Sequence, residues 1–180
     1  HQKALRIFFG SFGDGATSAE AAGNVTHLYS NASYSTAKYD VKLTAKSAEG
    51  GCQSTHVSPT KVTVYSRIDP NFVVKDLGGC APFNATIINT SKGNVANTYE
   101  WDFETDSKVD LIEPSFVAER QHLFSNATSK LAGYKVSLKV TNEGGCSKNT
   151  SGMALVYPQP VADFAVDNAL GCNPLPVSFK

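Results

Sequence analysis

The sequence of 180 residues has little that would point to a nucleic acid or to a membrane. Its 16 basic and 16 acidic side chains cancel, so no net charge is available to attract nucleic acid or an acidic membrane surface. No apolar run approaches the ~20 residues that a membrane helix needs. The chain opens without a signal peptide, and its abrupt ends are typical of a segment taken from a longer protein. We therefore expect no nucleic-acid partner and no membrane span in this segment.

Helix-forming residues in amphipathic spacing are also scarce, and there is a single Met. Thr, Ser, Val and Asn are abundant, and the 14 Gly and 8 Pro are spread along the chain rather than bunched. This composition is typical of short strands joined by turns. It predicts an all-β protein.

Signatures of catalysis are missing as well. The sequence contains no Gly-rich phosphate loop, no nucleophile elbow and no Cys/His zinc spacing. His27 and His122 have no partner at ligand spacing, and we interpret them as packed side chains that bond to backbone. Asp102, Glu104 and Asp106 alternate along a predicted strand, so solvated carboxylates are favoured over a calcium site. We expect no enzyme activity, no cofactor and no metal.

What the chain does contain is a repeat. HLYSNAS at 27–33 returns as HLFSNAT at 122–128, and YDVKLTA at 39–45 returns as YKVSLKV at 134–140, both at an offset of 95 residues. Further blocks follow in the same order, with offsets that drift between 91 and 95 as loop insertions would make them drift. The repeat divides the chain into the back part of a first copy (1–66), a complete second copy (67–158) and the front of a third (159–180).

Within the complete copy, alternation of apolar and polar residues predicts strands with one buried face. Tyr134, Val136 and Leu138 alternate with polar residues, and so do Tyr99, Trp101 and Phe103. Turn signals recur about every 8–12 residues, which is the spacing of an all-β sandwich. Asp14 lies in a Phe-Gly-Asp-Gly turn, where we expect it to bond its own backbone.

Three blocks of the complete copy together resemble the polycystic kidney disease (PKD) domain family. They are YEWDFETD at 99–106, HLF at 122–124 and YKVSLKVTN at 134–142. In the first copy Gly10 stands where the family pattern has Trp. The resemblance implies tandem immunoglobulin-like (PKD-type) β-sandwiches arranged end to end. Its expected structural core is formed by Trp101, Phe103, His122, Tyr134, Val136 and Leu138.

The resemblance also implies an extracellular, cell-surface setting, like that of large surface proteins of gliding or biofilm-forming bacteria. The favoured hypothesis is a structural and adhesive repeat segment of a stalk or filament. Its partners would be neighbouring PKD-like repeats and surface glycans or proteins. The alternative hypothesis is a spacer or carbohydrate-binding module of a secreted hydrolase. The junctions at 65–70 and 157–160 contain Pro and are expected to be stiff.

Asn-x-Ser/Thr sequons are more frequent than chance allows. Six occur, where 12 Asn and 32 Ser plus Thr would give about two. Glycosylation of an exposed surface protein is one interpretation; the other is that turn-rich β-chains are rich in these residues. The candidate sites are Asn24, Asn31, Asn84, Asn89, Asn126 and Asn149.

The four cysteines, Cys52, Cys80, Cys146 and Cys172, are expected to form disulfides in an extracellular repeat. In a sandwich of the implied kind, Cys80 and Cys146 lie at opposite ends, ~23 Å apart along a strand. A disulfide tolerates a Cα separation of only ~7 Å. We therefore expect bonds to cysteines outside the segment that staple neighbouring repeats, with a Cys80–Cys146 bridge as the alternative.

Overall fold

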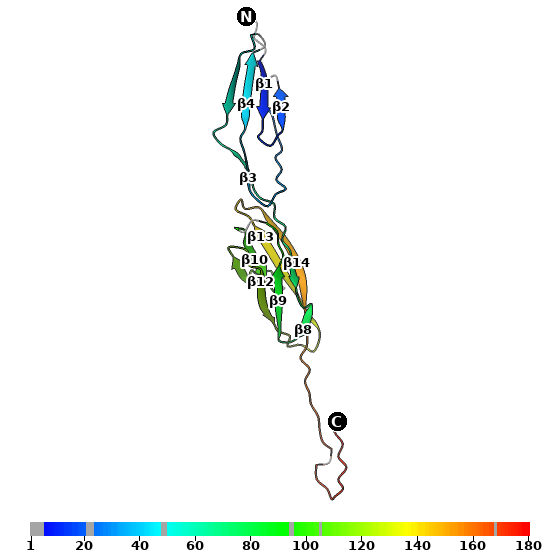
Figure 1. The fold of residues 1–180 in the computed structure, drawn as a ribbon. Helices are drawn as coiled ribbons and strands as arrows, with labels where there is room; N and C mark the ends of the chain where they lie inside the picture. Colours follow the sequence, from blue (N-terminus) through cyan, green and yellow to red (C-terminus); the bar gives the residue numbers. More distant parts are fainter. Residues whose placement is uncertain (1–5, 21–23, 48–49, 94–95, 105, 168) are drawn as a thin grey trace.

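The computed structural model describes residues 6–20, 24–47, 50–93, 96–104, 106–167 and 169–180. Every regular secondary-structure element among these residues is a β-strand. The all-β class expected from the composition is confirmed. Figure 1 shows the strands gathered in two units that follow one another along one line. We call them the N-terminal unit (6–66) and the central unit (67–158); an extended C-terminal segment (159–180) leaves the far end of the central unit.

The N-terminal unit is built on one antiparallel sheet. Its strands β1 (Arg6–Ser11), β2 (Thr17–Glu20), β4 (Lys42–Ser47) and β5 (Gln53–Val57) lie in the order β2-β1-β4-β5. Strands β3 (Ala37–Tyr39) and β6 (Val62–Val64) form a separate antiparallel pair. Within the described residues, no second sheet packs on the four-stranded one.

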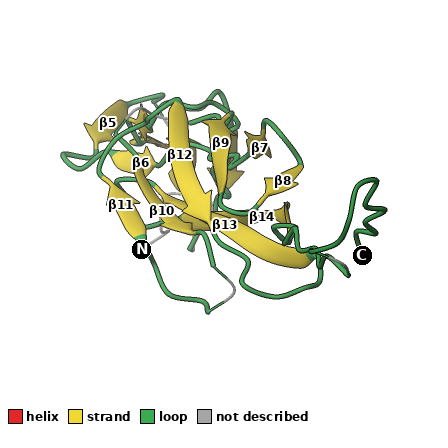
Figure 2. Ribbon diagram, turned by 90° about the horizontal axis from the view of Figure 1, so that it is seen from below, coloured by secondary structure: helices red, strands yellow, loops and turns green. Residues whose placement is uncertain are grey.

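The central unit has two layers, which Figure 2 shows along the length of the molecule. Its elements are β7 (Phe72–Val74), β8 (Gly78–Cys80), β9 (Phe83–Asn89), β10 (Thr98–Asp102), β11 (Leu111–Glu113), β12 (Glu119–Phe124), β13 (Ala132–Thr141) and β14 (Ser147–Tyr157). One sheet has the order β11-β10-β13-β14-β8 and the other β12-β9-β7. Strands β13 and β14 pair along their whole shared length and form one long hairpin.

The core lies between these two layers, because each strand turns alternate side chains inward. Trp101, Val136 and Leu138 have no exposed surface, and Phe103 is almost completely buried. Trp101 lies opposite Leu138 in the sheet, and its ring contacts that of Phe72 edge-on at a centroid distance of 5.4 Å. The alternation read from the sequence therefore matches the buried face of β10 and β13.

Two residues expected in the core lie instead at its edge. His122 and Tyr134 are half-buried. The His122 ring stacks on Phe103 at 4.4 Å, and the Tyr134 hydroxyl donates to the Ser125 carbonyl. Each side chain has an apolar ring and a polar group that needs a partner, so both lie at the boundary of the core rather than inside it.

The repeat in the sequence is also a repeat in strand register. Gly10 on β1 lies opposite Leu43 on β4, just as Trp101 on β10 lies opposite Leu138 on β13. A chain of ring contacts recurs in the same order, Phe12–His27–Tyr29–Tyr39 in the N-terminal unit and Phe103–His122–Phe124–Tyr134 in the central unit. The two units therefore use equivalent residues in equivalent places.

The N-terminal unit departs from expectation in two ways. The strand that corresponds to β13 is divided into β3 and β4. Its partner strand is longer than β14, because two more residues lie between Cys52 and Tyr65 than between Cys146 and Tyr157. Leu43, expected to be inward, is 46% exposed, whereas its counterpart Leu138 has no exposed surface. The difference follows from the missing second layer, since an inward side chain is buried only if something covers it.

Candidate functional site at the junction between the units

The linker between the two units, residues 65–70, is hydrogen-bonded on both sides. The Arg67 amide donates to the Ser33 carbonyl of the N-terminal unit at 2.9 Å. Asp69 and Lys92 exchange two backbone hydrogen bonds of 2.9 Å each in the central unit. Ser66 and Ile68 are buried. Main-chain bonds to both neighbours fix this short connection far more firmly than proline alone would.

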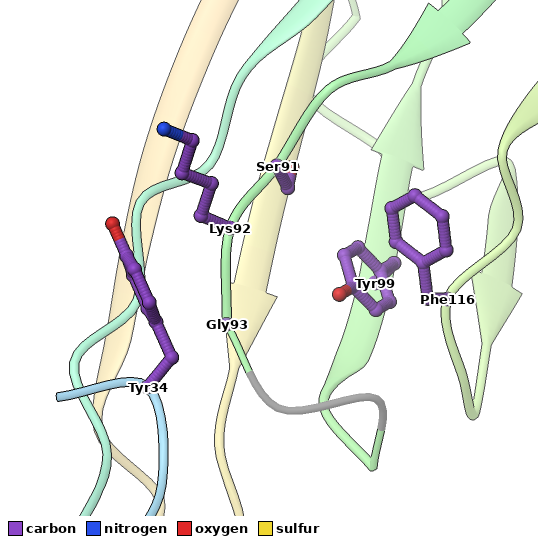
Figure 3. Close-up of a pocket in the computed structure, with 6 residues that line it drawn as sticks. All are labelled: Tyr34, Ser91, Lys92, Gly93, Tyr99 and Phe116. Carbon is purple, nitrogen blue, oxygen red and sulfur yellow. The ribbon is translucent and has the colours of Figure 1, made fainter.

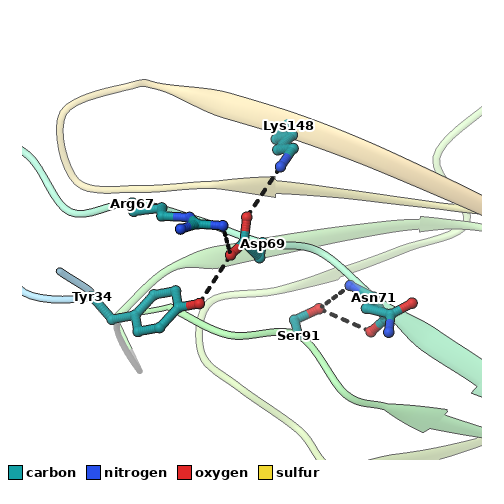
Figure 4. A network of polar contacts seen from close by, with 6 residues as sticks. All are labelled: Tyr34, Arg67, Asp69, Asn71, Ser91 and Lys148. Atoms are coloured by element: carbon teal, nitrogen blue, oxygen red, sulfur yellow. Dashed lines mark hydrogen bonds and ion pairs between the residues drawn. The ribbon is translucent and has the colours of Figure 1, made fainter. Parts of the chain in front are cut away.

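A carboxylate at the centre of the linker gathers donors from both units (Figure 4). Asp69 accepts from the Tyr34 hydroxyl at 2.9 Å and pairs with Arg67 at 2.7 Å and Lys148 at 3.1 Å. The hydrogen bonds from Lys148 and Tyr34 lower the pKa of Asp69 to about 2. The same bond to Asp69 raises the pKa of Tyr34. We call these four residues the Asp69 clamp; Tyr34 belongs to the N-terminal unit, Arg67 and Asp69 to the linker, and Lys148 to β14.

The hairpin between β13 and β14 forms a second contact with the linker. Asn142 is buried, and its Nδ2 donates to the Ser66 carbonyl at 3.0 Å while its Oδ1 accepts from the amides of Gly144 and Cys146. A Cβ on Gly144 would lie 2.2 Å from the Tyr65 ring, so a larger residue there would have to displace that ring. Glu143 accepts from the Thr36 hydroxyl of the N-terminal unit. The tip of the central unit thus packs directly on the end of the N-terminal one.

Beside the clamp lies an open hollow of about 360 Å³ (Figure 3). Its aromatic residues are Tyr34 from the N-terminal unit and Tyr99 and Phe116 from the central unit. Tyr99 is buried, and its ring meets that of Phe116 edge-on at 5.9 Å. Only Tyr34 and Phe116 expose their rings, and Figure 3 shows them on opposite sides of the hollow. The rings form no flat platform.

The two histidines singled out by the repeat differ in their partners. His27 Nε2 lies 2.6 Å from an Asp14 carboxylate oxygen, and its ring stacks on Phe12 at 4.0 Å. The prediction that His27 bonds to backbone is therefore wrong, because the fold brings the Asp14 turn against it. Asp14 also accepts from the Ala16 amide at 3.0 Å, the local turn bond expected of it. Burial lowers the pKa of His122, which favours its neutral form.

The prediction that Asp102, Glu104 and Asp106 alternate along one strand is wrong, because β10 ends at Asp102 and the other two lie in the following turn. Asp102 and Asp106 accept bonds from nearby backbone. Asp102 accepts from the Glu104 amide, and Asp106 accepts from the Lys108 amide at 2.9 Å and pairs with the Lys108 side chain. The Lys108 backbone and side chain lower the pKa of Asp106. Across the described part of the chain, no three His, Cys, Asp or Glu side chains gather in a way that could hold a metal ion.

Three of the six sequon asparagines, Asn31, Asn89 and Asn126, bond to backbone through their side chains. Asn84 Nδ2 instead donates to the Gln121 side chain at 3.2 Å. Asn126 Nδ2 donates to the carbonyls of Lys130 and Val156 at 2.7 and 2.8 Å, and Asn31 makes the equivalent bonds to Ser35 and Val64. Asn89 is 4% exposed. A glycan on Nδ2 would remove a donor at Asn31 and Asn126 and has no room at Asn89. At these three positions the structure argues against glycosylation and favours a structural role; Asn24, Asn84 and Asn149 are exposed.

We expect Asn126→Asp to destabilise the central unit and Asn149→Asp to leave it unchanged. The aspartate puts an acceptor oxygen against two carbonyls, so their bonds are lost at a cost of ~1–3 kcal/mol. Asn149 is an exposed sequon asparagine on β14 and is the matched control. Urea unfolding of both variants measures the difference. Equal stability of the two would show that the Asn126 amide has no structural role.

The four cysteines are free and exposed. Cys80 lies opposite Tyr157, the last residue of β14, whereas Cys146 immediately precedes Ser147, the first. The length of this strand separates the two cysteines by ~36 Å at ~3.3 Å per residue. Cys146 lies in the hairpin at the junction, and Cys80 lies at the opposite end of the central unit (Figure 1). A bridge between them within one chain is incompatible with this fold.

Two functional groups escaped the sequence analysis. Glu113 is buried on the edge strand β11, where it accepts from Trp101 Nε1 at 3.1 Å and from Arg120. Asp69 precedes Pro70 in the linker, and no sequence motif around it predicts that it accepts bonds from three side chains. The repeat gave one usable signal: Phe12 and His27 are matched by Phe103 and His122, and the two rings stack in both units.

In the part of the chain that the structure describes, no helix has the length and apolar character to cross a membrane. Neither a protein-family model nor a curated protein matches the chain.

Proposed function

We propose that the chain is a repeat segment of an extracellular, cell-surface stalk or filament, with a structural and adhesive role and no catalysis. Its units would be PKD-type β-sandwiches of immunoglobulin-like topology placed end to end, with neighbouring repeats as their main partners. The observation that carries the proposal is the Asp69 clamp. A junction with few contacts lets domains move relative to each other, whereas this one is tied by side chains and backbone from both sides.

The clamp can be tested in solution. We expect Asp69→Ala to widen the spread of angles between the units, because Tyr34, Arg67 and Lys148 lose their common acceptor. Small-angle X-ray scattering should report a shorter average end-to-end dimension than for the wild type. Exposed Asp76→Asn is the matched control. A broad spread of angles in the wild type itself would overturn the stalk proposal.

The same clamp should depend on pH. The pKa of Asp69 is about 2 in the folded protein, below the ordinary value of 3.8. A lowered carboxyl pKa contributes stability above the ordinary value, and that contribution is lost as the pH falls toward the folded value. The wild-type scattering profile should therefore approach that of Asp69→Ala only as the pH drops from about 4 toward 2.

Disulfides would stiffen such a rod if they joined neighbours. Cys146 lies in the hairpin at the junction and Cys80 at the opposite end of the central unit. We propose that each would pair with a cysteine outside residues 1–180. We expect mass spectrometry of the protein refolded under oxidising conditions to find no Cys80–Cys146 bond within a chain. Detection of that bond in monomeric protein would show that the strand topology is wrong.

The alternative, a spacer or carbohydrate-binding module of a secreted hydrolase, would use the junction hollow. The junction hollow exposes parts of Tyr34 and Phe116 beside Lys92. Sugar-binding surfaces need rings that lie flat and together, and here they are separated. Titration with soluble oligosaccharides, followed by Trp and Tyr fluorescence, distinguishes the two proposals.

A further inference from the structure

The linker contains the only Asp–Pro peptide bond in the sequence, between Asp69 and Pro70. The proline nitrogen belongs to a tertiary amide without a hydrogen, so it accepts a proton and leaves more readily than other amide nitrogens. An aspartate carboxylate can reach the carbonyl carbon of its own residue through a small ring, and carboxylates act as nucleophiles in proteins. The Asp69–Pro70 bond therefore carries both a good leaving group and its own nucleophile.

The repeat does not require this dipeptide. At the offset of 92 that relates the strands on either side, Asp69 and Pro70 correspond to Val161 and Ala162. The matching copy has neither a carboxylate nor a proline at these two positions. The Asp–Pro pair is thus a property of this particular junction and not of the repeated fold.

The carbonyl that the carboxylate would attack is already polarised. The Lys92 amide donates to the Asp69 carbonyl at 2.9 Å, and the Asp69 amide donates back to the Lys92 carbonyl at the same distance. An N–H group on a carbonyl oxygen stabilises the negative charge that develops there when a nucleophile adds to the carbon. One requirement for breaking the bond is therefore met in the folded protein.

The nucleophile is the part that is held back. Asp69 Oδ1 pairs with Lys148 at 3.1 Å, and Oδ2 accepts from the Tyr34 hydroxyl at 2.9 Å and pairs with Arg67 at 2.7 Å. Figure 4 shows that Lys148 and Tyr34 reach the carboxylate from different sides. To attack its own carbonyl carbon, the carboxylate must turn and break these bonds. Because Tyr34 and Lys148 belong to different units, the restraint lasts only while the units are docked.

We propose that the Asp69–Pro70 bond is a self-cleavage site, which the Asp69 clamp keeps inactive while the units are docked and which weak acid activates when the clamp opens. A carboxylate oxygen of Asp69 forms a bond to the Asp69 carbonyl carbon. The bond from that carbon to the Pro70 nitrogen breaks, and the nitrogen takes a proton from solvent. Water then opens the resulting cyclic anhydride to two carboxyl groups. One water molecule is consumed for each bond broken, and no oxidant or reductant takes part.

Self-cleavage would add a single reaction of the chain on itself to the proposed stalk, and it does not depend on the stalk role. The two are measured apart, because cleavage changes the mass of the chain whereas junction stiffness changes its scattering profile. A stiff junction that never cleaves leaves the stalk in place. A junction that cleaves but is not stiff leaves the cleavage site in place.

The reaction needs an ionised carboxylate together with a supply of protons, so it should be observed in weak acid. The groups that face Asp69 are Tyr34, Arg67 and Lys148, and all three keep their protons there. In the clamp the pKa of Asp69 is about 2, and loss of a donor lets it return toward the ordinary value of 3.8. At a pH near 3.8 the wild-type carboxylate is therefore ionised but held, whereas that of a clamp variant is partly ionised and free.

Mass spectrometry of the intact chain, incubated at a pH near 3.8, tests the proposal. We expect Lys148→Met to break after Asp69 at least about tenfold faster than the wild type, because its carboxylate can reach the carbonyl carbon. Tyr34→Phe removes only a hydroxyl and should act in the same direction with little effect on folding. Lys139→Met, which removes an exposed ion pair elsewhere on β13, is the matched control and should behave as the wild type. Rates of both clamp variants equal to that of the wild type overturn the proposal.

Unfolding would also free the carboxylate, so circular dichroism at the same pH must show native strand content in the variants that are compared. The wild type unfolded in guanidinium should break after Asp69 faster than the folded wild type, and equal rates would mean that the clamp gives no protection. Lys148→Met combined with Pro70→Ala retains the free carboxylate but has a less basic leaving nitrogen, so cleavage should stop. Cleavage at the same position in this double variant would also overturn the proposal.

Discussion

Replacement of Trp101 by Ala is expected to lower the free energy of unfolding of the central unit by ~3–5 kcal/mol. Trp101 has no exposed surface and is the largest fully buried side chain in the described residues. It lies between Phe72 and Phe103, at ring-centroid distances of 5.4 and 5.8 Å. No neighbour is placed to fill the cavity, because strands of both sheets hold the surrounding side chains in fixed register.

Chemical denaturation followed by circular dichroism measures this loss. Trp101→Phe is the informative comparison, since it retains most of the ring volume but loses the Nε1 donor to Glu113. We expect a smaller loss for Phe than for Ala. If Trp101→Ala cost less than about 1 kcal/mol, the ring would not be the centre of the core that its burial indicates.

Replacement of Arg120 by Met is expected to be nearly as damaging, toward the low end of ~3–5 kcal/mol. The Glu113 side chain is 3% exposed, and Arg120 neutralises it from β12 in the opposite layer. Without Arg120 the buried carboxylate keeps the Trp101 hydrogen bond but has no counter-charge. The Arg120 side chain is 37% exposed, so water relieves part of the penalty.

A double-mutant cycle checks this assignment. Glu113→Gln retains an acceptor for Trp101 without a charge, so adding it to Arg120→Met should recover stability. Lys139→Met, which removes an exposed pair with Glu100, is the control and should cost no more than ~1 kcal/mol. Additive losses at Glu113 and Arg120 would mean that the two side chains do not depend on each other.

Several strands of the repeat and most of its core could be predicted from the alternation of apolar and polar residues. Alternation places Trp101 and Leu138 on one face because successive side chains of any strand point to opposite sides. The repeat then transferred that assignment to β1 and β4, since the matched blocks put Gly10 in the place of Trp101 and Leu43 in the place of Leu138. These features are local or periodic, so they can be read without knowing which strands meet.

Which polar groups stabilise the fold depends on contacts between segments that are far apart in the sequence. Asp69 meets Lys148 across 79 positions of sequence, and Tyr34 meets Asp69 across 35. A sequon is a tripeptide pattern, and it is fulfilled both by Asn126, whose side chain donates to the Val156 carbonyl, and by exposed Asn149. Burial of Leu138 and exposure of Leu43 likewise depend on whether a second layer covers the sheet. These hydrogen bonds and this burial depend on segments that are far apart in the sequence, so a local sequence pattern cannot predict them.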